Sequence, residues 1–296
     1  MSILKSFLAL VLLAILCTPL TAQENFTFKV IVNKGKNEFK SGVTWQPIKV
    51  GASLLKSDEL RLSENSYIGL MHTSGKPLEL KHSGKYKVVD LANKMSGGTS
   101  VISKYTDFIL SSSENPKNTL KATGAVHRGS NITLYLPVSD QALIFNDEIT
   151  FGWDKDKIPG PYEVVFNSLF EDELHHIETT DNVVSVNMND PSLSNEDNII
   201  VYVISKSDPN KVSERYSLRR LSKADNERIK SQLQEYNLNV DENSALNKLY
   251  LASFFEENSL LIDAATALQE AIKLEPEVPF YQDAYQGFLI RNGLKK

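Results

Sequence analysis

Hydrophobic residues recur at every second position from Phe26 onward. Phe26, Phe28, Val30 and Val32 fall on one face of an extended segment, and the residues between them fall on the other. Short runs with the same period follow as far as Val88, separated by turn residues such as Ser, Gly, Asn and Asp. Short strands at this spacing predict an antiparallel meander or a small barrel.

A second group of apolar runs lies between about Thr119 and Leu221. The connections between these runs contain turn-forming residues, as in Pro159–Pro161. Six or seven short strands within roughly a hundred residues predict a β-sandwich. We expect strands at residues 132–136, 149–153, 162–166, 183–186, 199–204 and 216–218.

The hydrophobic period becomes that of an α-helix after Ser222. Ser222 and Asp225 suit a helix start, because a carboxylate in the first turn meets exposed backbone amides. Residues 243–294 predict three helices, of which the second ends at Pro276 and the last near Asn292. Small residues let the first two of these helices approach closely, and they are Ala252, Ala264 and Ala271.

The N-terminus has the pattern of a secretory signal peptide. Lys5 precedes an apolar run from Phe7 to Leu16, and small and polar residues follow it. We expect cleavage after Ala22. A lipid anchor on Cys17 is not expected, because Leu16 stands where a lipobox needs a small residue.

Composition and charge narrow the class of protein. The chain has 296 residues, enough for two or three domains, with a net charge of −5 that gives no general attraction to nucleic acid. Its single cysteine lies in the expected signal peptide, so the mature chain would have no disulfide or thiolate site. These features suit an exported protein of a bacterium, located in the periplasm or associated with the cell envelope.

One stretch resembles a known family. Residues 45–91 read WQPIKVGASLLKSDELRLSENSYIGLMHTSGKPLELKHSGKYKVVDL, and the tryptophan, the "SYIGL" strand, "SGKPLEL" and the closing "GKY" resemble the periplasmic FecR-like domain. The resemblance runs from Trp45 to Leu91. It implies a β-rich sensing or interaction module without catalytic activity. Family members that signal carry a cytoplasmic segment and a membrane span ahead of this domain, whereas here we expect only the signal peptide and no membrane span after its cleavage.

Two further resemblances concern architecture. The segments "ITFGW", "PGPYEVVF", "NVVSVNM" and "NIIVYVIS" are placed as in an immunoglobulin-like or fibronectin type III-like sandwich, without the cysteines of antibody domains. The helical tail resembles a tetratricopeptide repeat, although Lys248 stands where the repeat usually has an aromatic residue. The matching positions are Leu251, Ala252, Phe255, Ala264, Leu268, Ala271 and Pro276.

These patterns together predict a multidomain α+β protein. Two antiparallel β domains, a small meander or barrel and then an immunoglobulin-like sandwich, precede a short all-α bundle. The expected divisions are a signal peptide at 1–22, a FecR-like domain at 23–116, a sandwich at 117–221 and a tetratricopeptide-like helical domain at 222–296.

The histidines do not predict a metal site. If Ser74 and Gly75 form a hairpin turn, His82 lies opposite about Ile68, and His72 is then on the order of 13 Å away along the strand. The neighbouring His175 and His176 would point to opposite faces of a strand at a solvated hairpin tip. We therefore expect no metal and no cofactor.

The acidic segments read as turns. Asp154 and Asp156 are each followed by a lysine, and the proline-rich turn at 159–161 comes directly after them. We interpret them as a charged turn between two strands, anchored by a buried Trp153, and not as an acid–base pair. Residues 189–197 are read as a solvated connection, with a weak calcium loop as the alternative.

No recognised catalytic set is present in the sequence. It has no Gly-x-Ser-x-Gly, phosphate-binding or dinucleotide-binding motif, and Ser96–Ser100 lacks the strand and helix that would make it cradle phosphate. We therefore favour a non-catalytic envelope protein that binds other envelope proteins as a scaffold or adaptor. The alternatives are a ligand- or glycan-binding sensor and an enzyme with an unrecognised site.

The helical end is the expected docking surface for a partner protein. We expect a partner to contact aromatic side chains of these helices. Aromatic residues at helical spacing also commonly form a core, which is the competing interpretation. The residues predicted to dock a partner are Tyr250, Phe254, Tyr281 and Tyr285.

Overall fold

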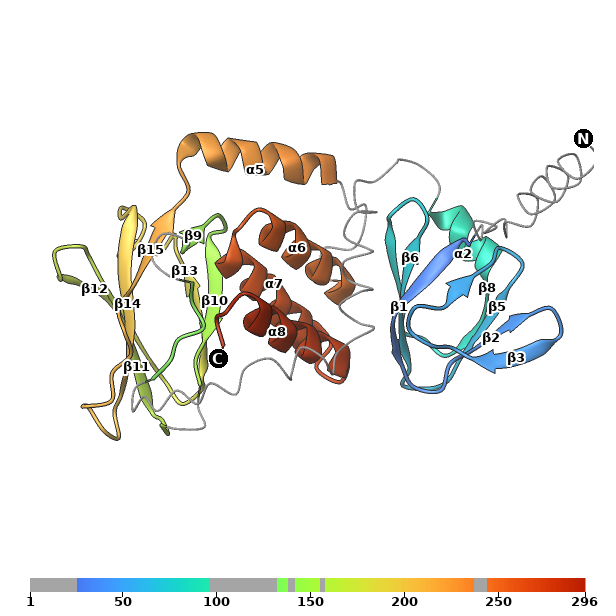
Figure 1. Ribbon diagram of the computed structural model, residues 1–296, viewed down its shortest axis with the longest axis horizontal. Helices are drawn as coiled ribbons and strands as arrows, with labels where there is room; N and C mark the ends of the chain where they lie inside the picture. Colours follow the sequence, from blue (N-terminus) through green and yellow to red (C-terminus); the bar gives the residue numbers. More distant parts are fainter. Residues whose placement is uncertain (1–25, 96–131, 138–141, 155–157, 237–243, 296) are drawn as a thin grey trace, which may run out of the picture.

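A computed structural model describes residues 26–95, 132–137, 142–154, 158–236 and 244–295. The expected signal peptide, the segment 96–131 and Asp156 lie outside these ranges. Sheets make up the first two-thirds of the described chain, and four helices follow them (Figure 1). The strand pairs in these sheets are antiparallel except for β15 and β9, which are parallel. The protein is therefore a multidomain α+β fold, as the hydrophobic pattern predicts.

The first β unit, residues 26–95, consists of two four-stranded sheets in the orders β4-β1-β6-β7 and β3-β2-β5-β8. Side chains such as Phe28, Leu54, Leu60 and Ile68 fill the space between them and are fully buried. The described strands form no closed barrel. The elements are β1 (Phe28–Lys34), β2 (Glu38–Ser41), β3 (Thr44–Pro47), β4 (Ser53–Leu54), β5 (Glu59–Leu62), β6 (Tyr67–His72), β7 (Pro77–Leu80), β8 (Gly84–Lys87) and α2 (Val88–Lys94).

An irregularity in β1 changes which way its side chains face. Val30 pairs with Leu70 and Val32 with Gly69, so Ile31 is an extra residue in the ladder. Phe28 and Val30 enter the core of the first β unit, while Ile31 and Val32 pack against the helices. The predicted single apolar face from Phe26 to Val32 is therefore wrong at Val32, because the bulge breaks the period of two.

The second β region has a five-stranded sheet, in the order β12-β11-β14-β15-β9, and the two-stranded pair β10-β13. Trp153, Phe151 and Phe166 are buried in its core. The expected strand at 132–136 is reduced to one bridge between Leu134 and Trp153. The elements are β9 (Leu143–Ile144), β10 (Glu148–Gly152), β11 (Tyr162–Asn167), β12 (Glu173–Thr179), β13 (Val183–Asn187), β14 (Asn198–Ser205) and β15 (Tyr216–Arg220).

Capping residues and prolines mark where the helices begin and end. Ser244 begins α6 by accepting a hydrogen bond from the Asn247 backbone N–H. The helix α7 ends before Pro276, and Pro279 occupies the first turn of α8. The helices are α5 (Lys223–Tyr236), α6 (Ala245–Glu257), α7 (Leu261–Leu274) and α8 (Pro279–Arg291). Among the described residues, no helix has both the length and the apolar character needed to cross a membrane.

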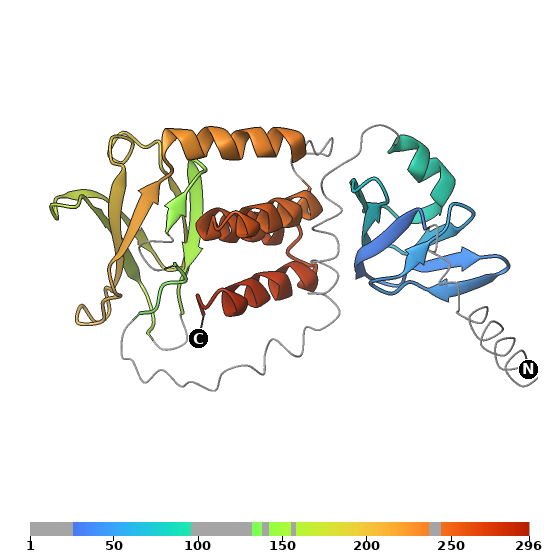
Figure 2. The same cartoon turned by 45° about the horizontal axis from the view of Figure 1, so that its top comes forward.

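The helices lie between the two β regions (Figures 1 and 2). On one side, α7 packs on β10, and Ile262 enters the core of the sandwich. Two hydrogen bonds to Asp263 and one to Thr266 reinforce this contact. The helices and the sandwich therefore share buried contacts across the expected boundary at residues 221 and 222.

On their other side the helices meet β6 and β7 of the first β unit. The hydroxyls of Tyr67 and Tyr281 lie 2.6 Å apart, and Glu79 accepts a hydrogen bond from the Leu246 backbone N–H at the start of α6. The Lys81 ammonium lies 2.6 Å from a carboxylate oxygen of Glu275. This contact joins segments that are far apart in the sequence.

Candidate functional site

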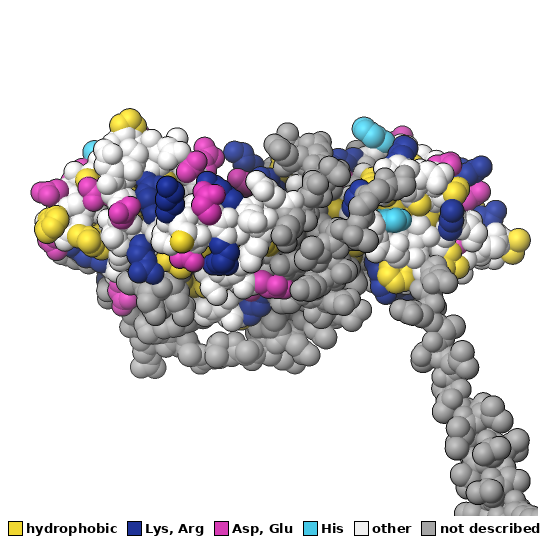
Figure 3. Space-filling view, turned by 90° about the horizontal axis from the view of Figure 1, so that it is seen from above, with side chains coloured by type: hydrophobic (Ala, Val, Ile, Leu, Met, Phe, Trp, Pro, Cys, Tyr) yellow, Lys and Arg dark blue, Asp and Glu magenta, His cyan; other side chains and the backbone are white. Residues whose placement is uncertain are grey.

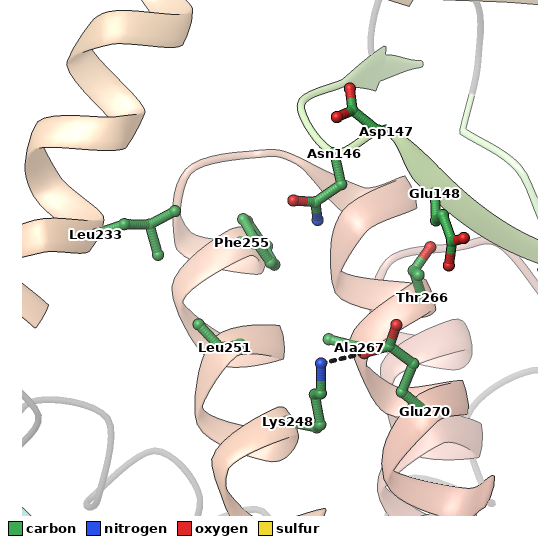
Figure 4. A pocket seen from close by; sticks show the side chains of 10 residues that line it. All are labelled: Asn146, Asp147, Glu148, Leu233, Lys248, Leu251, Phe255, Thr266, Ala267 and Glu270. Atoms are coloured by element: carbon green, nitrogen blue, oxygen red, sulfur yellow. Dashed lines mark ion pairs between the residues drawn. The ribbon is translucent and has the colours of Figure 1, made fainter. Parts of the chain in front are cut away.

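A cleft opens where α5, α6 and α7 meet the turn between β9 and β10 (Figure 4). Its volume is about 330 Å³, which falls at the small end of the range for ligand pockets. The lining comes from four separate parts of the chain. It comprises Asn146, Asp147, Glu148, Leu233, Lys248, Leu251, Phe255, Thr266, Ala267 and Glu270.

The floor of the cleft is apolar. Leu233 projects from α5, Leu251 and Phe255 from α6, and Ala267 from α7. The ring centroids of Phe255 and Phe145 lie 5.9 Å apart, and Phe145 is the first residue of the β9–β10 turn. A floor of this kind favours burial of an apolar group from a ligand.

The rim of the cleft is acidic. Asp147 and Glu148 lie on the side of the turn, and Glu270 lies on α7. The Lys248 ammonium lies 2.6 Å from a carboxylate oxygen of Glu270, and this ion pair is partly exposed to solvent. Three carboxylates against one ammonium leave a net negative rim, which favours a cationic group beside the apolar one.

Buried polar groups of α7 fix the position of the turn. The Asp263 carboxylate accepts hydrogen bonds from the backbone N–H groups of Phe145, at 3.0 Å, and Asn146, at 2.7 Å. Burial raises the pKa of Asp263 to about 7, and these two hydrogen bonds offset only part of that effect. The Thr266 hydroxyl accepts a hydrogen bond from the Thr150 backbone N–H at 2.8 Å. These hydrogen bonds join the β9–β10 turn and β10 to α7 beside the cleft.

One cluster contains the residue types of a hydrolase triad but not its geometry. The Ser192 hydroxyl donates to Asp190 Oδ1 at 2.5 Å and lies 3.5 Å from His175 Nδ1. In a triad the histidine lies between the nucleophile and the acid, whereas here the serine lies between them. The cluster closes a loop between β13 and β14, and the order of its hydrogen bonds differs from that of a triad.

One histidine meets an acidic residue: His176 Nδ1 lies 2.9 Å from Glu173 Oε1. Ile68 pairs with Leu80 in the β6–β7 hairpin, so His82 falls beyond β7 and not opposite Ile68 as expected. His175 and His176 lie within the strand β12 at the edge of the five-stranded sheet, and not at a hairpin tip as expected. Within the described ranges, no group of three His, Cys, Asp or Glu side chains is placed to hold a metal ion.

The four aromatic residues predicted to dock a partner are all buried within the chain. Tyr281 meets Tyr67 of the first β unit, and Phe254 forms a ring contact with Phe255. Contact with a partner protein stays a prediction, and it would require these side chains to leave the positions they occupy here. Tyr250, Phe254, Tyr281 and Tyr285 are each 5% exposed or less.

The cleft was not predicted from the sequence. Its residues lie in four segments whose convergence depends on how α7 packs on β10 and how α5 returns over α6. The only local signal was the small residues on α6 and α7, which predict their close approach. No protein-family model and no curated protein matches this chain.

Proposed function

We propose that this is an exported, non-catalytic envelope protein that binds other proteins, and that the cleft between α5, α6, α7 and the β9–β10 turn receives a segment of its partner. The observation that carries this proposal is the apolar floor beneath a negatively charged rim. A polypeptide segment with an apolar side chain next to a lysine or arginine has the matching chemistry.

Two features of the sequence support this assignment. The N-terminal pattern suits export, and the FecR-like and tetratricopeptide-like resemblances belong to modules that sense or bind. Export is tested by comparing the N-terminus of the protein in its native host with Gln23, the first residue expected after cleavage. An N-terminus upstream of the apolar run would contradict export by this route.

The binding role is tested by cross-linking from inside the cleft. A photo-reactive amino acid placed at Leu251 should cross-link a partner in the native envelope, and mass spectrometry should recover one predominant protein. The substitution Leu233→Glu puts a charge beside the floor and should abolish the cross-link. Gln234→Glu adds the same charge at an exposed position on the same helix and should leave the cross-link intact.

The acidic rim gives a second and graded test. Glu148→Gln and Glu270→Gln should each weaken cross-linking, because a cationic group of the partner loses part of its attraction. If the Leu233→Glu chain and the unaltered chain gave equal yields of the cross-linked partner, the partner would bind outside the cleft.

The second candidate function is a sensor of a small ligand, and the volume of the cleft favours it. A small amphiphile with one positive charge should then raise the melting temperature of the unaltered chain but not that of Leu233→Glu. A ligand that stabilised both chains equally would exclude the cleft as its site.

A further inference from the structure

Charge is strongly segregated along this chain. Residues 26–95 contain 12 lysines and arginines against 6 aspartates and glutamates, a net charge of +6. Residues 142–296 contain 15 lysines and arginines against 27 aspartates and glutamates, a net charge of −12. The overall charge of −5 therefore conceals two parts of opposite sign.

The positive charge gathers on the outer face of the sheet β3-β2-β5-β8. Residues that lie directly opposite one another on neighbouring strands have their side chains on the same face of the sheet. Lys40 lies opposite Trp45 on β3 and opposite Glu59 on β5. On β5 and β8, Arg61 lies opposite Lys85 and Glu59 lies opposite Lys87, so all these side chains share one face. Phe39 and Leu60 point to the other face and join the core. We call this surface the basic face, and define it by Lys40, Trp45, Arg61, Lys85 and Lys87. Glu38 and Glu59 lie on the same face, so four cations stand against two carboxylates.

Most of the charge on the basic face is available to a partner. The Arg61 guanidinium lies 4.5 Å from the Trp45 ring centroid and also donates to Glu38 at 2.8 Å. Within the described ranges, Lys40, Lys85 and Lys87 form no ion pair. The basic face therefore offers an aromatic ring beside three unpaired ammonium groups.

Exposed apolar residues followed by acidic residues occur at the tip of the β11–β12 hairpin. Leu169 is 56% exposed and Phe170 is 88% exposed, although both are large apolar residues. Glu171, Asp172 and Glu173 follow directly, and the only cation that pairs with Glu171 in the described ranges is Arg215, at 2.9 Å. We call residues 169–173 the acidic tip.

The two surfaces lie at opposite ends of the molecule. The strand β3 and the hairpin of β11 and β12 are at the two ends of the long axis in Figure 1. Figure 3 shows acidic and hydrophobic side chains at the sandwich end, and lysines and arginines on the first β unit. One molecule cannot bring its own basic face to its own acidic tip in this arrangement, but two molecules can.

We propose that the basic face of one copy of this chain binds the acidic tip of a second copy, so that copies join head to tail. Phe170 of one copy would cover Trp45 of the next, and its acidic residues would face Lys40, Lys85 and Lys87. An association between two different surfaces leaves one of each free at the ends and can continue into a linear assembly. This inference is independent of the cleft and of its partner.

Sedimentation velocity of the mature chain tests the proposal over a range of protein concentrations. In about 20 mM salt the protein should form a series of species that grows with concentration, and about 500 mM salt should return it to monomer, because charge attraction is screened. Phe170→Ser should leave only monomer, and so should the pair Lys85→Glu and Lys87→Glu. The matched control pair Lys223→Glu and Lys230→Glu, on α5, should associate like the unaltered chain.

A mixing experiment separates this arrangement from other modes of association. The Phe170→Ser chain keeps its basic face, and the chain with Lys85→Glu and Lys87→Glu keeps its acidic tip. Their mixture should therefore form a dimer of one copy each and nothing larger. A monomer at every concentration in low salt, a dimer formed by either variant alone, or association unchanged by Phe170→Ser would overturn the proposal. Circular dichroism confirms that each variant is folded before the comparison.

Discussion

The hydroxyl groups of Tyr67 and Tyr281 lie 2.6 Å apart, although 214 residues separate them in the chain. Tyr67 also donates to Glu79 at 2.6 Å, and Glu79 accepts from the Leu246 backbone N–H at 2.7 Å. Because Tyr67 has one hydroxyl hydrogen and gives it to Glu79, Tyr281 must be the donor to Tyr67. Burial raises the pKa of both tyrosines, so both remain protonated donors. This buried chain of hydrogen bonds attaches the first β unit to the helices.

Tyr67→Phe should loosen that attachment. The substitution removes the acceptor of Tyr281 and the donor to Glu79, and an unpaired buried polar group costs about 1–3 kcal/mol. Hydrogen exchange at the amides of β6 and α8 should accelerate. Tyr86→Phe is the matched control, because its hydroxyl donates to His82 at an exposed site. Equal exchange in the two variants would show that the tyrosine pair carries no part of the attachment.

A larger side chain at Gly69 should separate the same two parts sterically. A Cβ atom there would lie 3.2 Å from Val32 and 3.3 Å from Leu246, because β6 approaches α6 closely. We expect Gly69→Val to expand the molecule in small-angle scattering while both parts keep their circular dichroism. Gly42→Asn is the control for folding, because a Cβ atom there would meet nothing within 4 Å apart from its chain neighbours, and asparagine tolerates the φ of +75°. An unchanged radius of gyration for Gly69→Val would contradict close packing at this point.

Thr266→Val should destabilise the contact between α7 and the sandwich. The Thr150 backbone N–H is buried and would lose its acceptor, at a cost of about 1–3 kcal/mol in the free energy of unfolding. Thr266→Ser keeps the hydroxyl and should retain most of the stability. Urea denaturation of the two variants measures the difference. If the valine variant were as stable as the serine variant, the hydrogen bond to Thr150 would be unimportant.

Asp263 should make stability depend on pH. Its pKa in the folded state is about 7 against an ordinary value of 3.8, so the folded state holds the proton more tightly than the unfolded state. Its contribution is fully present below about pH 4 and is lost as the pH rises to about 7, by up to about 4 kcal/mol. The advantage of the unaltered chain over Asp263→Asn should therefore shrink across this range. Asp283→Asn, at an exposed site on α8, is the control for the loss of a carboxylate outside the core.

Much of the local structure could be predicted from the sequence. The apolar runs predict strands at residues 149–153 and 199–204, and the structure has strands at Glu148–Gly152 and Asn198–Ser205. Trp153 is fully buried, as its place at the end of a strand predicts. The strand Glu173–Thr179 was missed because its side chains are mostly exposed or partly exposed, so it carries little hydrophobic period.

The sequence alone determined the type and approximate position of most helices and strands, and the difference in charge between the two parts of the chain. It did not decide what covers each apolar face, because a local period shows that a face is apolar and not which distant segment packs on it. Only the tertiary structure paired Tyr281 with Tyr67 and buried the aromatic residues that the sequence predicts to dock a partner. It also formed the cleft and put the basic face and the acidic tip at opposite ends, since both results depend on contacts between residues far apart in the chain.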